Sequence, residues 1–63
     1  MHTYYLLLSH PSGRMTVKKW KSPYKSGLKT KTHFYGSAYH FNTEASLIKM
    51  TRTKKAMNKY LRR

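Results

Sequence analysis

The chain has 63 residues and a formal net charge of +13, because fourteen Lys and Arg are opposed by one acidic residue. With no Asp and a single Glu, the sequence excludes carboxylate dyads, Ser-His-Asp arrangements and carboxylate-held magnesium, and the absence of cysteine excludes disulfides and thiolate zinc sites. So short a chain forms one domain with a thin core, and its charge directs it to nucleic acid or to an acidic partner.

Residues 3–9 are short, apolar and aromatic, which is typical of a strand at the centre of a sheet; a buried helical turn is the alternative. The segment His10-Pro11-Ser12-Gly13-Arg14 places proline in a type I turn and glycine at the left-handed position that follows, so it predicts a hairpin. A second strand is expected over residues 14–21, leaving the core near Trp20.

A loop is expected over residues 22–27, where Ser, Pro and Gly are frequent and periodicity is absent. Residues 28–41 then return to extended character. Within them, Gly36-Ser37 is interpreted either as a two-residue hairpin turn or as a bulge in one long strand. The sheet therefore has three or four strands.

Residues 43–62 have the pattern of one long amphipathic helix. Apolar side chains fall on one side of it, and Asn42 or Thr43 is placed to cap its first turn, close to Glu44. The other side is basic and contains no acid. The predicted fold is thus α+β, an antiparallel three- or four-stranded sheet packed against one long C-terminal helix, in the order strand, strand, strand, helix.

The first strand carries apolar side chains on both faces, since Leu6 and Leu8 point one way and Tyr5 and Leu7 the other. One helix covers only one face of a sheet. We therefore expect an uncovered apolar face, open to a partner protein, to nucleobases or to a second copy in a homodimer.

Two stretches resemble known families. The strand-and-helix layout resembles the arm-site DNA-binding domains of tyrosine integrases and the plant AP2 domain, and residues 41–45 are similar to the Phe-x-Thr-x-x-Ala of the integrase domains, with the alanine one position early. Residues 36–41 are similar to a strand of small toxin ribonucleases, where histidine follows Gly-Ser directly and this chain has Ala38. The second resemblance implies metal-independent RNA cleavage.

The function expected from the sequence is binding of DNA or RNA through phosphates, without catalysis and without a cofactor. Basic residues interleave with aromatic ones, which suits both phosphate contact and base stacking, the latter by Trp20 and Tyr35. The predicted nucleic-acid-binding residues are Lys18, Lys19, Trp20, Lys21, Lys25, Lys29, Lys31, Tyr35, Arg52, Lys55, Lys59 and Arg62.

The main alternative is a phage-like inhibitor or adaptor that docks on an acidic surface of a host polymerase, nuclease or toxin. Lesser alternatives are a ribosome-associated protein and a metal-independent ribonuclease. The four histidines have no companions at ligand spacing, so no metal is expected. We expect no membrane or small-molecule partner and a cytoplasmic location, with association with the nucleoid or the ribosome left open.

Overall fold

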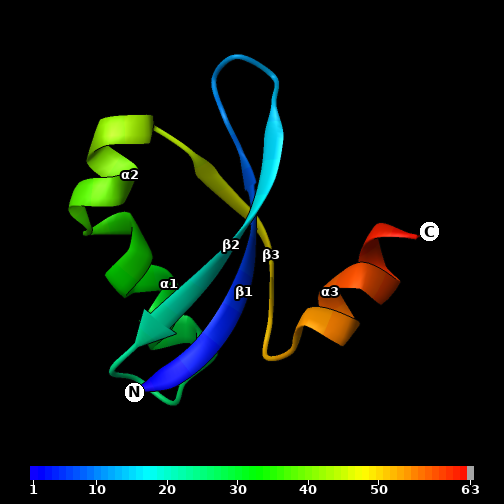
Figure 1. Ribbon diagram of the computed structural model, residues 1–63. Coiled ribbons are helices and arrows are strands. Elements are labelled where there is room, and N and C mark those ends of the chain that lie inside the picture. Colours follow the sequence, from blue (N-terminus) through cyan, green and yellow to red (C-terminus); the bar gives the residue numbers. More distant parts are fainter. Residues whose placement is uncertain (63) are drawn as a thin grey trace.

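Three strands and three helices make up the computed structural model, which describes residues 1–62. In chain order they are β1 (His2–Ser9), β2 (Met15–Ser22), α1 (Gly27–Tyr35), α2 (Ala38–Thr43), β3 (Ser46–Thr51) and α3 (Lys54–Leu61) (Figure 1). The strands form one antiparallel sheet in the order β2-β1-β3. The α+β class and the three antiparallel strands agree with the sequence prediction.

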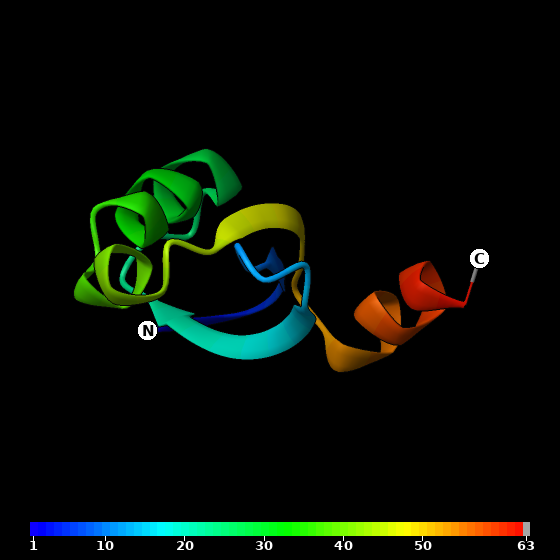
Figure 2. The same ribbon diagram turned by 90° about the horizontal axis from the view of Figure 1, so that it is seen from above.

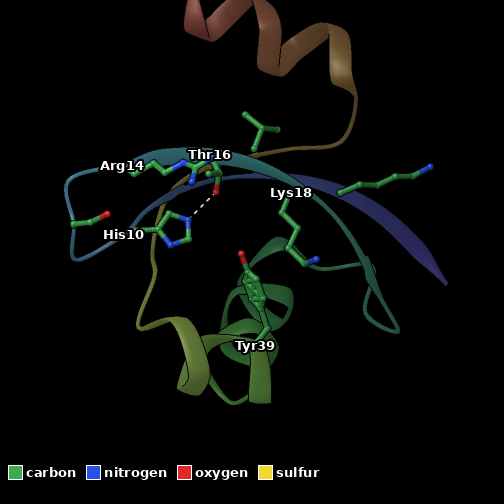
Figure 3. Close-up of a pocket in the computed structure, with 8 residues that line it drawn as sticks. His10, Arg14, Thr16, Lys18 and Tyr39 are labelled. Carbon is green, nitrogen blue, oxygen red and sulfur yellow. Dashed lines mark hydrogen bonds between the residues drawn. The ribbon is translucent and has the colours of Figure 1, made fainter.

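The helices lie on both sides of the sheet. Helices α1 and α2 cover what we call the inner face, and α3 stands apart from them beside the sheet (Figures 1 and 2). A closer view places α3 across the sheet from α1 and α2, over what we call the outer face (Figure 3). Because side chains alternate along a strand, each strand supplies residues to both faces.

The core centres on β1, which pairs with both other strands. On the inner face Tyr4, Leu6 and Leu8 pack with Phe34 of α1. On the outer face Leu7 is only 4% exposed, and Met57 of α3 is fully buried. Burial on both faces explains why residues 3–9 read as a nearly continuous apolar run.

The hairpin between β1 and β2 has the turn that its sequence predicts. Gly13 adopts a φ of +88°, a left-handed conformation that glycine tolerates without strain. Its N–H donates to the carbonyl of His10 at 2.9 Å, and the His10 N–H donates to the carbonyl of Arg14 at 2.8 Å. The turn fixes a register in which Leu7 pairs with Val17 and Tyr4 with Trp20.

The prediction of extended chain over residues 28–41 is wrong, because this segment forms α1 and α2. A serine caps each helix: Ser26 Oγ accepts from the Lys29 N–H, and Ser37 Oγ accepts from the His40 N–H. The buried positions of α1 are Thr30 and Phe34, four residues apart. The Thr30 hydroxyl donates to Ser22 Oγ at 2.9 Å inside the domain, so the buried face of α1 includes a polar residue. The sequence therefore lacks the apolar periodicity by which a helix is usually predicted.

The prediction of one helix over residues 43–62 is also wrong, because the segment divides into β3 and the short α3. The pairing of β1 with β3 shifts register between Leu7 and Leu8, so that Leu47 and Met50 both face the inner core. A bulged strand thereby reproduces the three-residue spacing of a helix. Glu44, expected in a first helical turn, instead ends α2 with a left-handed φ of 54°.

The observed order is strand, strand, helix, helix, strand, helix, which departs from the expected layout. The resemblance to integrase arm-site and AP2 domains rested on three strands before one helix, and the chain lacks that layout within residues 1–62. Residues 36–41 lie at the end of α1 and in α2, where the toxin ribonucleases have a strand. Neither resemblance extends to the fold.

The apolar outer face, expected to be open, is largely covered. Met57 of α3 is fully buried, and Leu7 beneath this helix is nearly so. What remains is a margin of side chains about half exposed, Met15 at 52%, Val17 at 45% and Ile48 at 48%. A homodimer formed through this face, as the sequence led us to expect, would have only these three partly exposed apolar side chains to bury.

Replacement of Thr53 tests the short α3 against one long helix. Thr53 Oγ1 accepts from the Ala56 N–H at 3.1 Å as an N-cap, so Thr53→Ala should lower the free energy of unfolding by about 0.5–2 kcal/mol. Inside a continuous helix the same change would raise it by a few tenths of a kcal/mol. The check is urea unfolding, with Thr32→Ala on the exposed side of α1 as the matched threonine; stabilisation by Thr53→Ala would contradict the boundary at residue 53.

Met57 tests the docking of α3 on the outer face. Met57→Ala should cost about 2–5 kcal/mol of unfolding free energy, because it removes a fully buried side chain from a small core. The exposed neighbour Asn58, changed to alanine, should alter stability by less than about 0.5 kcal/mol. Equal effects of the two changes in chemical denaturation would mean that α3 is not packed on the sheet.

Candidate nucleic-acid interface

The exposed side of α3 carries a row of basic residues. Three of the predicted contacts, Lys55, Lys59 and Arg62, are exposed and follow one another at spacings of three and four, which places them on one side of the helix. With Lys54 and Asn58 they line a shallow groove. We call this surface the α3 ridge.

A second groove connects the α3 ridge with the outer face of the sheet. It is lined by Tyr5, Val17, Lys19, Lys54 and Asn58. Lys54 and Asn58 belong to both grooves, so the two surfaces are continuous. The groove adds the predicted residue Lys19 and one partly exposed aromatic ring, Tyr5.

The third hollow lies at the hairpin end of the sheet, between β2 and α2, and we call it the hairpin pocket (Figure 3). Val17 and Lys19 line both the hairpin pocket and the groove under α3.

Because β2 is an edge strand, the surface continues around it from the outer to the inner face. We call the whole surface the basic track; it runs over the hairpin pocket, β2 and the α3 ridge.

Two contacts order the hairpin pocket. The Nε2 atom of His10 lies 2.8 Å from Thr16 Oγ1, which ties the turn to the start of β2 (Figure 3). The Lys18 ammonium sits 4.7 Å from the centre of the Tyr39 ring, a cation–π contact that joins β2 to α2. The remaining polar residues of the wall are Ser12 and Arg14.

Four predicted lysines lie outside the track. Lys21 is exposed near the end of β2, and Lys25 is exposed in the loop before α1. Lys29 and Lys31 are about 200° apart around α1 and therefore point to different sides. Lys29 borders a separate groove with Tyr24, Leu28, Thr32 and His33.

Three predicted residues already have contacts within the fold. The half-buried Trp20 ring packs edge-on against Phe34, His33 and Tyr39. The Tyr35 hydroxyl accepts from the Leu47 N–H at 2.9 Å and so holds β3 against α1. Arg52, which precedes α3, donates from Nε to the carbonyl of Thr3 and stacks over the Tyr4 ring at 4.6 Å.

Trp20 and Tyr35 are therefore not free platforms for bases. Tyr5 lines the track instead. It was expected on a strand face open to nucleobases but is not among the predicted binding residues. The predicted binding residues also lack six members of the hairpin pocket and of the α3 ridge, namely His10, Arg14, Thr16, Tyr39, Lys54 and Asn58. One signal was available, since Arg14, Thr16 and Lys18 alternate and so share one face of a strand.

Electrostatics distinguish the track from an ordinary charged surface. The single acidic residue, Glu44, lies at the end of α2 and lines none of its three hollows. Surfaces that are merely solvated normally mix both signs of charge. The track is thus a cationic surface without an internal counter-charge.

Within residues 1–62 no group of three or more metal-ligating side chains occurs, and no helix there is long and apolar enough to span a membrane. Comparisons of the chain with protein-family models, with curated proteins and with solved structures found no match.

Proposed function

We propose that the protein binds single-stranded nucleic acid through its phosphates along the basic track. The observation that carries this proposal is the continuity of the three hollows, which share Val17 and Lys19 on one side and Lys54 and Asn58 on the other. A row of cations without carboxylates matches a row of phosphates, and binding releases the counterions of both.

The shape of the track favours a single strand over a duplex. The track passes from one face of the sheet to the other around β2, within a domain whose principal extents are 30 × 29 × 15 Å. Duplex DNA has a persistence length of about 150 base pairs, so it resists bending on this scale, whereas a single strand follows such a path readily. The partly exposed Tyr5 offers a ring on which a base can stack.

In the free protein the closely spaced cations of the track repel one another and destabilise α3. Lys55 and Lys59, four residues apart on α3, repel each other by a few tenths of a kcal/mol. Lys54 adds a further positive charge next to them. A bound polyanion removes this repulsion, so binding and the stability of α3 are coupled.

A second candidate function is docking on an acidic surface of another protein. The half-exposed Met15, Val17 and Ile48 favour it, because a protein interface uses an apolar centre that phosphate contact does not need. For both functions we propose a cytoplasmic location. They differ in their dependence on salt.

Salt titration is the experiment that tests the proposal. If Lys19, Lys54, Lys55, Lys59 and Arg62 each neutralise one phosphate, log K for a single-stranded oligonucleotide should fall with log[salt] at a slope of about −3.5. Affinity then drops roughly a hundredfold between about 50 and 200 mM salt. Fluorescence anisotropy measures this directly. A slope near zero, or tight binding only to an acidic protein, would overturn the proposal.

Single substitutions test the path of the strand. Lys54→Gln and Lys19→Gln should each weaken binding several-fold and reduce the magnitude of the salt slope by about 0.7, because each removes one phosphate contact. Lys31→Gln removes the same charge from an exposed position on α1 outside the track and should have a much smaller effect. If all three variants bind alike, net charge rather than the track governs affinity.

A further inference from the structure

The hairpin pocket contains a cation in an unusual place. Lys18 lies on the inner face of the sheet, opposite Leu6 in the register, and its side chain is half-buried. The neighbouring inner positions of β1, Leu6 and Leu8, are fully buried apolar residues. A positive charge on the core side of a sheet loses hydration without gaining a carboxylate partner.

The Tyr39 ring offsets part of this loss, because its face lies 4.7 Å from the Lys18 ammonium. No carboxylate faces the ammonium in the pocket, since Glu44, the single acidic residue, does not line it. An anion held beside Lys18 would supply the missing partner. The pocket therefore has positive side chains in its wall and no negative group to balance them.

Hydrogen-bond donors converge on the same space from three segments. Arg14 lies at the end of the turn just before β2, Thr16 shares the inner face of β2 with Lys18, and His10 approaches from the other side of the turn. The Tyr39 hydroxyl points from α2 toward the sheet, between His10 and Lys18 (Figure 3). These groups include a guanidinium fork, an ammonium, the Tyr39 hydroxyl and the His10–Thr16 pair, whose own hydrogen bond uses one donor of the pair.

The number and charge of these donors suit one kind of anion better than another. An internal phosphodiester has one charge and two free oxygens, and it passes along a surface. A terminal phosphate monoester has a charge of about −1.5 to −2 and three strong acceptor oxygens, which match donors that surround it. The hairpin pocket also lies at one end of the track, where a strand would end.

We propose that the hairpin pocket binds the terminal phosphate of a nucleic acid strand whose following nucleotides run along the basic track. This proposal rests on the proposed function for the path of the strand. Recognition of the phosphate itself depends only on the pocket. The protein is then a binder of phosphorylated strand ends, and the 5′ and 3′ ends are the two sources of this phosphate.

The test compares three single-stranded 12-mers of one sequence with an internal fluorophore. One has a 5′-phosphate, one a 3′-phosphate and one hydroxyls at both ends. At a fixed salt concentration, one phosphorylated strand should bind about tenfold or more tightly than the hydroxyl strand, as expected for charge-assisted hydrogen bonds. Whichever end gives the preference is the end that the pocket holds.

Two variants assign the preference to the pocket. Tyr39→Phe keeps the ring under Lys18 and removes only the hydroxyl, while Arg14→Gln changes an exposed side chain, so both should fold. Each should reduce the ratio between phosphorylated and hydroxyl strands toward one. Lys31→Gln, which removes an equal charge outside the pocket, should leave that ratio unchanged.

Each outcome separates this proposal from the proposed function. Equal binding of all three strands, or a preference that both pocket variants retain, overturns the terminal-phosphate site and leaves the track intact. If no strand binds, the proposed function fails. Inorganic phosphate then gives an independent readout, because saturable shifts of Thr16 and Tyr39 NMR signals would support a phosphate site and their absence would overturn it.

Discussion

The structure depends on the pairing of β1 with two neighbours and on its burial from both faces. In 63 residues no other segment has enough apolar surface to organise two layers of helices. On one side Leu6 and Leu8 pack with residues of α1 and α2, and on the other Leu7 of β1 and Met57 of α3 are both buried where α3 meets the sheet. Since β3 joins β1 from the far end of the chain, the last third of the sequence completes the sheet and also positions the α3 ridge.

The first two strands and their turn were predictable because their signals are local. The strand order and the helices were not predictable, because tertiary contacts decide whether a given spacing of apolar residues belongs to a strand or to a helix. Leu47 and Met50 have a helical spacing, but a bulge gives them that spacing within a strand. Thr30 is polar and fully buried, so α1 lacks a visible apolar stripe. Serine caps at Ser26 and Ser37 marked both short helices, yet β-branched and aromatic residues after them favoured extended chain.

The sequence was enough to predict that the candidate site would bind phosphates, but not where on the fold the site would lie. Composition alone indicated phosphate contact, and the basic residues of α3 followed from their spacing. The path around β2 depends on α3 lying over the outer face, which no local pattern encodes. Aromatic residues were the least predictable: Trp20 and Tyr35 are used inside the fold, whereas Tyr5 and Tyr39 line the track. In so small a domain each ring serves either the core or a ligand, and only the packing decides which.

Both outer strands of the sheet, β2 and β3, have one edge without a strand partner, and backbone groups along such an edge can pair with another copy of the chain. On β2 the lysines at 18, 19 and 21 oppose such pairing through repulsion between copies. The charge that attracts an anion thus also keeps the protein dispersed. A ligand that neutralises these lysines removes that protection unless it covers the edge itself, which a strand lying around β2 does. A short or sparse polyanion would instead neutralise the edge without shielding it, and would promote self-association.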